Sequence, residues 1–262
     1  MSNLLDAAYR AEPGVSATAL LRLAKSPAHY KWATEHPGPS TPAQLLGTAV
    51  HAAVLEPESF SAQFRVADTD GRTKAGKEQR EAAAAAGVTL FSTDDYADVL
   101  GMAGAVLTHP IAGKLIDGAR TEVILRWKDM ATEVLCKGRA DAVATLDGKP
   151  AVVDLKTTGD ASPQATARSL GSFGYHIQLA HYRDGVMRQF DLPDRPPCFL
   201  VAIEREPPYP VAVYLLDEDT LTAAHTERVR LLALWRRCTE RNEWPAYADD
   251  AVLPLSLPAW AR

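Results

Sequence analysis

The stretch from Lys137 to Thr158 constrains this chain most, because its pattern predicts both a hairpin and the residues that face each other across it. Two alternating runs rich in β-branched residues flank Asp147-Gly148, a dipeptide that favours a two-residue type I′ turn. With that turn as the loop, Asp141 lies opposite Asp154 at a position without ladder hydrogen bonds, where facing Cβ atoms are roughly 4.5–5.5 Å apart. The sequence therefore predicts two carboxylates side by side on one hairpin face.

These two carboxylates need a positive partner, because like charges that face each other on a sheet are destabilising. A divalent cation with oxygen ligands is the obvious candidate. The period of two also places Lys156 on the same face as Asp154. Two carboxylates that bind a metal, together with an ammonium group, make a site that can polarise a phosphodiester and activate a water. The alternative is a surface hairpin with solvated charges; the apolar residues that flank these three, such as Val152 and Val153, favour the site.

Composition sets wide bounds. The 262 residues suffice for one large domain or two small ones, and 47% hydrophobic with 23% charged residues is ordinary for a soluble globular protein. No apolar run approaches the roughly 18 residues that span a bilayer, and the first ten residues lack the features of a secretory signal, so a cytoplasmic location is expected. A net charge of −5 argues against a largely basic surface but leaves room for a local basic channel.

The cysteines argue against a sulfur-ligated metal. Cys136, Cys198 and Cys238 are widely separated, and the sequence contains no C-x-x-C. A zinc or iron–sulfur site built on cysteines is therefore not expected. We expect the three to be reduced thiols in or near the core.

The remaining pattern predicts a helical N-terminal portion (1–118), a core of strands and helices (119–245) and an irregular tail (246–262), integrated into one domain. The tail is expected to pack on the body or on a neighbouring subunit. Helices are predicted at 16–30, 44–56, 82–86, 93–106, 175–190 and 217–242. Strands are predicted at 121–129, 133–146, 151–158, 198–206 and 210–217.

His51 lies in the predicted helix that Pro57 ends. A lone histidine on a helix of small residues is usually a packed, hydrogen-bonded core residue. Neutral imidazole is also a suitable metal ligand beside carboxylates, and small residues such as Gly47 would let this helix approach the sheet closely. The residues alone leave both interpretations open.

Several of these stretches resemble one nuclease superfamily. G-R-A-D, a turn and V-V-D-L-K-T-T are similar to the core of PD-(D/E)xK nucleases, with Asp141 as the first aspartate and Asp154-x-Lys156 as the (D/E)xK. Gln178-Leu-Ala-His-Tyr182 resembles the Q-x-x-x-Y helix of the branch that contains the RecB nuclease domain, lambda exonuclease and RecE-type exonucleases. The resemblance to RecE-like (exonuclease VIII) nucleases, found in phages and prophages, runs from residue 16 to residue 260.

The resemblance implies a fold, an activity and partners. The fold is α/β, with a mixed central sheet flanked by helices. The activity is Mg²⁺-dependent degradation of linear double-stranded DNA from its ends, in the 5′→3′ direction, with Mn²⁺ as a substitute metal. The expected assembly is a ring-shaped homo-oligomer, a tetramer or trimer, that works beside a single-strand annealing protein in recombination. Relatives with an iron–sulfur cluster carry an early C-P, where this chain has Ser26-Pro27, so no cluster is expected.

The resemblance also assigns roles to residues. The string G-T-x-x-H-x-x-x-L-E-P is similar to the family element whose histidine binds metal, which favours the ligand interpretation of His51. The implied ligands are His51, Asp141, Asp154 and the main-chain carbonyl of Leu155. Lys156 would orient the attacking water or neutralise charge in the transition state.

The implied roles of three further residues are less specific. Gln178 and Tyr182 share a helix face and would position the phosphate, although such a pair is common on amphipathic helices. For Glu122 two interpretations have equal weight: a further metal ligand, or an exposed residue at a strand end.

A basic stretch runs from Arg65 to Arg80. Its residues Arg72, Lys74 and Lys77 are candidates to contact DNA phosphates from a loop beside the cleft. A solvated loop is nearly as good an interpretation.

Two other functions remain open from the sequence. An endonuclease of the same fold, used in repair or restriction, would cleave circular DNA. A non-catalytic DNA-binding module of this fold ranks third, because such a module is expected to have lost a ligand, whereas Asp141, Asp154 and Lys156 are all present.

Overall fold

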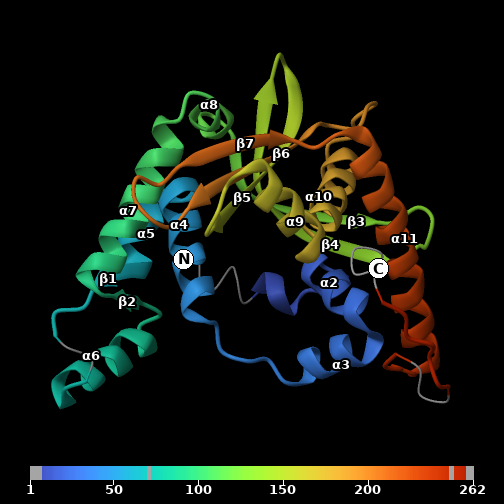
Figure 1. Cartoon of the computed structure of the whole chain (residues 1–262), viewed down its shortest axis with the longest axis horizontal. Coiled ribbons are helices and arrows are strands. Elements are labelled where there is room, and N and C mark those ends of the chain that lie inside the picture. The colour runs from blue at the N-terminus through green and yellow to red at the C-terminus, as the bar shows by residue number, and fades with distance from the viewer. Residues whose placement is uncertain (1–7, 70–71, 248–250, 258–262) are drawn as a thin grey trace.

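A five-stranded mixed sheet forms the centre of the structure, a computed structural model that describes residues 8–69, 72–247 and 251–257 (Figure 1). Its strands lie in the order β3-β4-β5-β6-β7. The β5–β6 pair is parallel and the other three pairs are antiparallel. The bounds are β3 Arg120–Lys128, β4 Leu135–Leu146, β5 Lys149–Thr158, β6 Cys198–Glu204 and β7 Val211–Leu215. The predicted mixed sheet flanked by helices is confirmed.

The hairpin has the predicted register. Ala142 pairs with Val153, and the pairing continues to Leu146 opposite Lys149. Asp147 and Gly148 both have positive φ angles, 49° and 76°, as a type I′ turn requires. The β4–β5 pairs end at Ala142 and Val153, immediately before the positions of Asp141 and Asp154.

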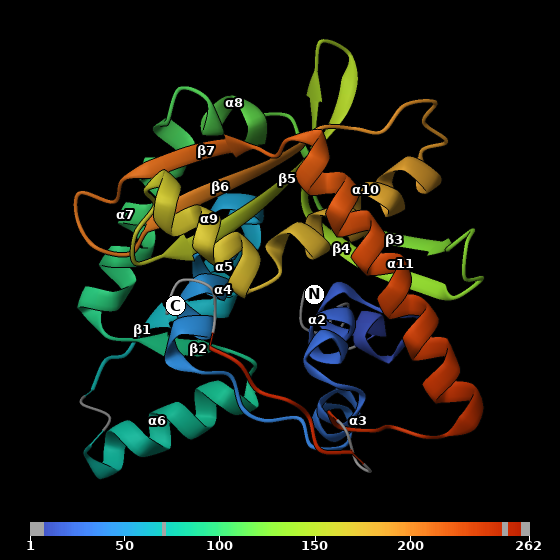
Figure 2. The same ribbon diagram turned by 45° about the vertical axis from the view of Figure 1, so that its right-hand side comes forward.

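Helices cover both faces of the sheet (Figures 1 and 2). The core on one face includes side chains of α4 and α7 with Val153 and Leu155 of β5, and the core on the other face includes α2, α10 and α11 with Val152. The helix bounds are α2 Ala17–Lys25, α3 Pro27–Glu35, α4 Pro42–Leu55, α5 Pro57–Gln63, α6 Lys74–Ala85, α7 Thr93–Thr108, α8 Ala112–Ile116, α9 Pro163–Ser172, α10 Tyr175–Gln189 and α11 Glu218–Arg241. Two short parallel strands, β1 Phe64–Val66 and β2 Thr89–Phe91, lie beside α5 to α7.

Local sequence explains why α4 begins where it does. Thr41 and Gln44 form a reciprocal capping box, in which each side chain accepts the other residue's main-chain N–H. Pro42 occupies the first turn, where its missing N–H is not needed. Further along, residues 49 and 50 and 52–55 are buried, so this helix packs directly on the sheet.

Two predictions need correction, and one helix was not predicted. The helix predicted over 16–30 is two helices, because Ser26 breaks the first and its side chain caps the second. The segment predicted as a basic loop is mostly helical, since Thr73 caps α6. Helix α9 was not predicted at all; its N-cap is Ser162, whose hydroxyl accepts from Ala165 N. In the tail, residues 251–257 are exposed, with Val252 99% exposed, and packing on the body or on a neighbouring subunit stays a prediction; positions 248–250 and 258–262, also assigned to the tail, lie outside the described residues.

A buried ionic group joins three elements on the α11 side. Arg228 of α11 is fully buried, and its guanidinium donates to Asp129, which follows β3, at 2.7 Å and also to Asp184 of α10. Breaking such a pair leaves an uncompensated buried charge, which is strongly destabilising. The group therefore fixes α11 against the sheet. The sequence pattern gave no sign of a buried arginine on this helix.

None of the helices in the described ranges is long and apolar enough to cross a membrane.

Two helical glycines test how tightly α10 packs on β3. A Cβ at Gly185 would lie 2.8 Å from Trp127 Cζ3 and 3.0 Å from Leu125 Cδ1, whereas a Cβ at Gly104 of α7 would meet nothing within 4 Å. Gly185→Ala should therefore lower the free energy of unfolding by about 1–3 kcal/mol through overpacking. Gly104→Ala, the matched control, should raise it by about 0.5–1 kcal/mol because alanine loses less backbone entropy. Urea denaturation measures both, and a stabilised Gly185→Ala would show that the interface is looser than described.

Candidate metal centre and active site

The candidate site lies where the β4–β5 pairing ends. Asp141 is buried there, and its Oδ2 accepts the main-chain N–H of Leu155 at 2.8 Å. The carboxylate thus accepts a hydrogen bond from β5 that a main-chain carbonyl of the neighbouring strand would otherwise accept. This bond holds Asp141 against the segment that carries Asp154 and Lys156.

His51 reaches the same point from α4. Its Nε2 lies 2.7 Å from the main-chain oxygen of Leu155, a residue 104 positions away in the sequence. Gly47 lies one turn earlier on the helix, where a Cβ would be 3.3 Å from Thr157 Oγ1, so a small residue there permits the close approach of α4 to β5. The predicted proximity of this helix to the sheet is confirmed.

The protonation of His51 follows from its partners. A carbonyl oxygen can only accept, so Nε2 carries the proton and Nδ1 presents a lone pair. Burial lowers the pKa of His51, as does the charge of Lys156, while Asp141 acts in the opposite direction. The ring is therefore neutral at neutral pH. Its Nδ1 lies 3.6 Å from Asp141 Oδ2, which leaves two electron-pair donors facing each other.

Glu122 completes a cluster of potential ligands. It lies in β3 across from Asp141, between the pairs Thr121–Ala142 and Val123–Ala140. Its φ angle of 49° is unusual for a residue other than glycine and costs backbone energy, which strained positions at functional sites often do. One potential ligand atom each of His51, Glu122 and Asp141 lies within 4.8 Å of the others. The geometry favours the ligand interpretation of Glu122, which the sequence left even.

Asp154 and Lys156 form a buried ion pair beside this cluster. Asp154 is fully buried, and its Oδ2 is 2.6 Å from Lys156 Nζ. Burial raises the pKa of Asp154 to about 7, with Lys156 opposing the shift and Asp141 adding to it. Burial would lower the pKa of Lys156, but the charges of Asp154 and Asp141 raise it overall. The carboxylate of Asp154 is therefore occupied by the ammonium group and is not part of the three-residue cluster.

Residues of α10 hold the other side of Asp154. Gln178 Nε2 donates to Asp154 Oδ1 at 3.1 Å and to the hydroxyl of Tyr182 at 3.1 Å. Tyr182 is buried against Gly138, where a Cβ would be 3.0 Å from its ring. Burial raises the pKa of Tyr182 well above its usual value, so the phenol stays protonated. In the structure this pair orients Asp154, and a contact with phosphate stays a prediction.

The sequence analysis missed Tyr175 and Arg139. The Tyr175 ring centroid lies 5.2 Å from Lys156 Nζ, a cation–π distance. Its position three residues before Gln178, on the same face of a predicted helix, was a signal that could have found it. Arg139 Nε lies 2.7 Å from Glu122 Oε2. The G-R-A-D string contains Arg139, but nothing in the pattern pointed to its partner.

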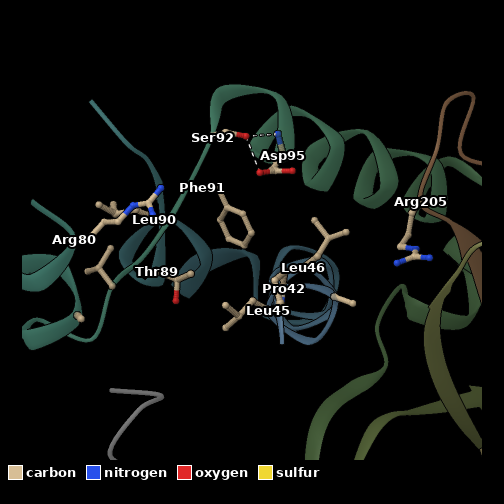
Figure 3. Close-up of a pocket in the computed structure, with 13 residues that line it drawn as sticks. Pro42, Leu45, Leu46, Arg80, Thr89, Leu90, Phe91, Ser92, Asp95 and Arg205 are labelled. Atoms are coloured by element: carbon tan, nitrogen blue, oxygen red, sulfur yellow. Dashed lines mark hydrogen bonds between the residues drawn. The ribbon is translucent and has the colours of Figure 1, made fainter. Parts of the chain in front are cut away.

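The predicted DNA-binding residues lie apart from the metal cluster. Arg72 precedes α6, and Lys74 and Lys77 lie on it, away from the sheet (Figure 1). A hollow of about 790 Å³ lies between α4, α6 and β2. Figure 3 shows Leu45 and Phe91 between Arg80 at one side of this hollow and Arg205 at the other. This hollow contains none of the predicted catalytic residues. Asp141, Asp154 and Lys156 lie where the β4–β5 pairing ends, which we call the fork, and Gln178 and Tyr182 lie on α10.

The donor set fits a hard divalent cation. One imidazole nitrogen and two carboxylates converge, and the Nδ1 lone pair facing Asp141 is unfavourable unless a cation or a proton lies between them. The lowered pKa of His51 disfavours the proton. Asp154 lies next to this cluster and could join it if Lys156 moves.

A model of the PDDEXK-like domain of unknown function (DUF3799) matches residues 16–253, and the chain belongs to this family. A crystal structure described as a "Putative exonuclease" from Eubacterium rectale is similar in fold, with a TM-score of 0.61 and 13% identity over 95% of this chain and 92% of that chain. SSO0001 has 18% identity over 84% of this chain and 77% of that chain, but its TM-score of 0.35 supports no argument. No curated protein is similar enough to count as a match. The PD-(D/E)xK-like fold is confirmed, and the narrower RecE-like assignment stays a prediction.

Replacing His51 tests the metal cluster. His51→Ala should weaken Mn²⁺ binding by at least about tenfold, because an imidazole nitrogen is lost from the ligand set. Isothermal titration calorimetry on the folded variant measures this. His176→Ala is a matched control: His176 also has a ring nitrogen 2.7 Å from a main-chain oxygen, that of Leu170, and it should leave Mn²⁺ affinity unchanged. If His51→Ala lowers the melting temperature and leaves Mn²⁺ affinity intact, His51 is a packing residue.

Proposed function

We propose that this protein is a metal-dependent nuclease that degrades linear double-stranded DNA from its ends. The observation that carries the proposal is the convergence of His51, Glu122 and Asp141 beside the buried Asp154–Lys156 pair. A structural hairpin has no need of a strained glutamate and a histidine lone pair aimed at a carboxylate. A metal-dependent phosphodiesterase site needs ligands for the metal and gains from a positive charge near the reacting phosphate, and this fork offers both.

The residues divide the chemistry among them. His51, Glu122 and Asp141 would hold Mg²⁺ or Mn²⁺, which when bound lowers the pKa of a water and polarises the phosphate. Asp154 and the carbonyl of Leu155 stay predicted as further ligands. Lys156, held by Asp154 and by the Tyr175 ring, brings a positive charge to the place where negative charge develops. Gln178 keeps Asp154 oriented. No covalent intermediate on the protein is needed.

The substrate is proposed from the fold and the surrounding cations. The Eubacterium rectale protein that shares the fold carries the description of an exonuclease, and the resemblance to RecE-like nucleases implies a 5′→3′ direction and a recombination partner that anneals single strands. Arg72, Lys74 and Lys77 lie on or just before a helix that stands away from the sheet, and Arg80 and Arg205 border the hollow next to it. These positions suit contacts with phosphates, which position DNA without reading its sequence.

A comparison of DNA forms tests the proposed activity. With Mg²⁺ or Mn²⁺, the protein should degrade an end-labelled linear duplex and leave a covalently closed circle intact. Ca²⁺ should occupy the site without supporting cleavage, since it takes longer bonds and looser geometry. Denaturing gel electrophoresis measures both substrates. Cleavage of the circle at a comparable rate would identify an endonuclease instead, and full activity in excess chelator would contradict metal dependence.

Lys156→Ala is the control for contaminating nuclease. The variant should lose cleavage by at least about 10²-fold, because it removes the positive charge at the reacting phosphate. It should still bind Mn²⁺, since a charged lysine has no lone pair for a metal. A fully active Lys156→Ala would show that the activity belongs to another protein or another site.

We also propose the ring-shaped homo-oligomer that the resemblance implies. Val252 and Leu255 in the described part of the tail are each 99% exposed, and Leu253 and Leu257 are more than half exposed. Burying such a run against another subunit would be favourable. Sedimentation should give a trimer or tetramer, and truncation after Tyr247 should shift it toward monomer. A monomeric full-length chain at micromolar concentration would exclude the ring.

A further inference from the structure

Arg139 places a permanent positive charge inside the ligand cluster. It lies on β4, two residues before Asp141, and its Nε is 2.7 Å from Glu122 Oε2. The Glu122 side chain is 17% exposed and the Arg139 side chain 38%, so Arg139 is the more exposed partner of the pair. The charge of Arg139 also helps to lower the pKa of His51, although burial is the largest cause.

An arginine in this place competes with a metal ion. Both groups are attracted to the carboxylate of Glu122, and their positive charges repel each other across a few ångströms. The backbone at Glu122 has a strained φ angle, which aims this carboxylate at His51 and Asp141. A partly exposed ion pair that serves stability alone contributes little and would not require that strain. Arg139 and a metal ion at this cluster would therefore compete for the same carboxylate.

We propose that Arg139 occupies Glu122 in the metal-free protein and binds the scissile phosphate once a metal ion takes that carboxylate. The proposal rests on the metal-dependent nuclease function proposed above. A guanidinium suits this second role, because its planar donors match two phosphate oxygens at once, which an ammonium group cannot do. Its partial exposure leaves it open to a substrate in the fork. Arg139 is thus a substrate-binding residue whose availability depends on the metal.

Because Arg139 has these two roles, replacing it should strengthen metal binding and weaken DNA binding. Arg139→Ala should bind Mn²⁺ about fivefold or more tightly, because the competing charge is gone. The same variant should bind a short DNA duplex about tenfold or more weakly in Ca²⁺, which holds the site without supporting cleavage. Calorimetry with Mn²⁺ alone and fluorescence anisotropy with labelled duplex measure these. Arg139→Lys should keep Mn²⁺ affinity near wild type, because its charge remains, and should restore DNA affinity only in part.

Arg126→Ala is the matched control. Arg126 on β3 also pairs with a glutamate, Glu12, through two contacts of 2.6 Å, but this pair is not part of the ligand cluster. It should change neither Mn²⁺ nor DNA affinity. Melting temperatures of all variants show that the protein stays folded, and Arg139→Lys keeps the test decisive if Arg139→Ala unfolds.

The outcomes separate this proposal from the proposed function. If Arg139 only holds Glu122 in place, Arg139→Ala should weaken Mn²⁺ binding, and that result overturns the proposal. Unchanged Mn²⁺ affinity or unchanged DNA affinity in Arg139→Ala also overturns it. If the opposite-sign effects are found but wild-type protein cleaves no DNA, the role of Arg139 stands and the nuclease function fails. If wild-type protein does not bind Mn²⁺, both fail.

Discussion

The hydrogen bond from Leu155 N to Asp141 Oδ2 is the contact on which the candidate site depends. It forms where the β4–β5 pairing ends, and it fixes the next residues of β5 in place. Leu155 then turns its carbonyl to His51 on α4, while Asp154 and Lys156 point toward α10. This one hydrogen bond thus positions β5 so that α4 on one face of the sheet and α10 on the other both contact the fork.

Charge balance explains the arrangement of the remaining groups. Three carboxylates come close together in a largely buried place, which is unfavourable unless each has a positive partner. Lys156 neutralises Asp154 and Arg139 neutralises Glu122, while the main-chain N–H of Leu155 supports Asp141. A divalent cation at the cluster of His51, Glu122 and Asp141 would replace Arg139 as the partner of Glu122. These contacts hold the carboxylates in place, which lowers the cost of ordering the ligands on metal binding.

The hairpin could be predicted from the sequence because its determinants are local. A two-residue turn at Asp147-Gly148 and strict alternation fix which residues face each other, and the observed pairs follow that register. The approach of α4 is different: His51 and Leu155 lie 104 positions apart, and a periodic pattern carries no information about contacts at that range. The resemblance supplied it. The positive φ of Glu122 and the burial of Arg228 depend on packing around them, so the pattern indicated neither.

The account's central claim is that the β4–β5 fork binds a metal ion, and locating that ion tests it most directly. Crystals grown with Mn²⁺ should show an anomalous difference peak bounded by the side chains of His51, Glu122 and Asp141. The guanidinium of Arg139 should then have moved from the 2.7 Å contact that it makes with Glu122. An empty fork in crystals that hold Mn²⁺ elsewhere, with His51 and Asp141 in the arrangement described, would contradict the claim.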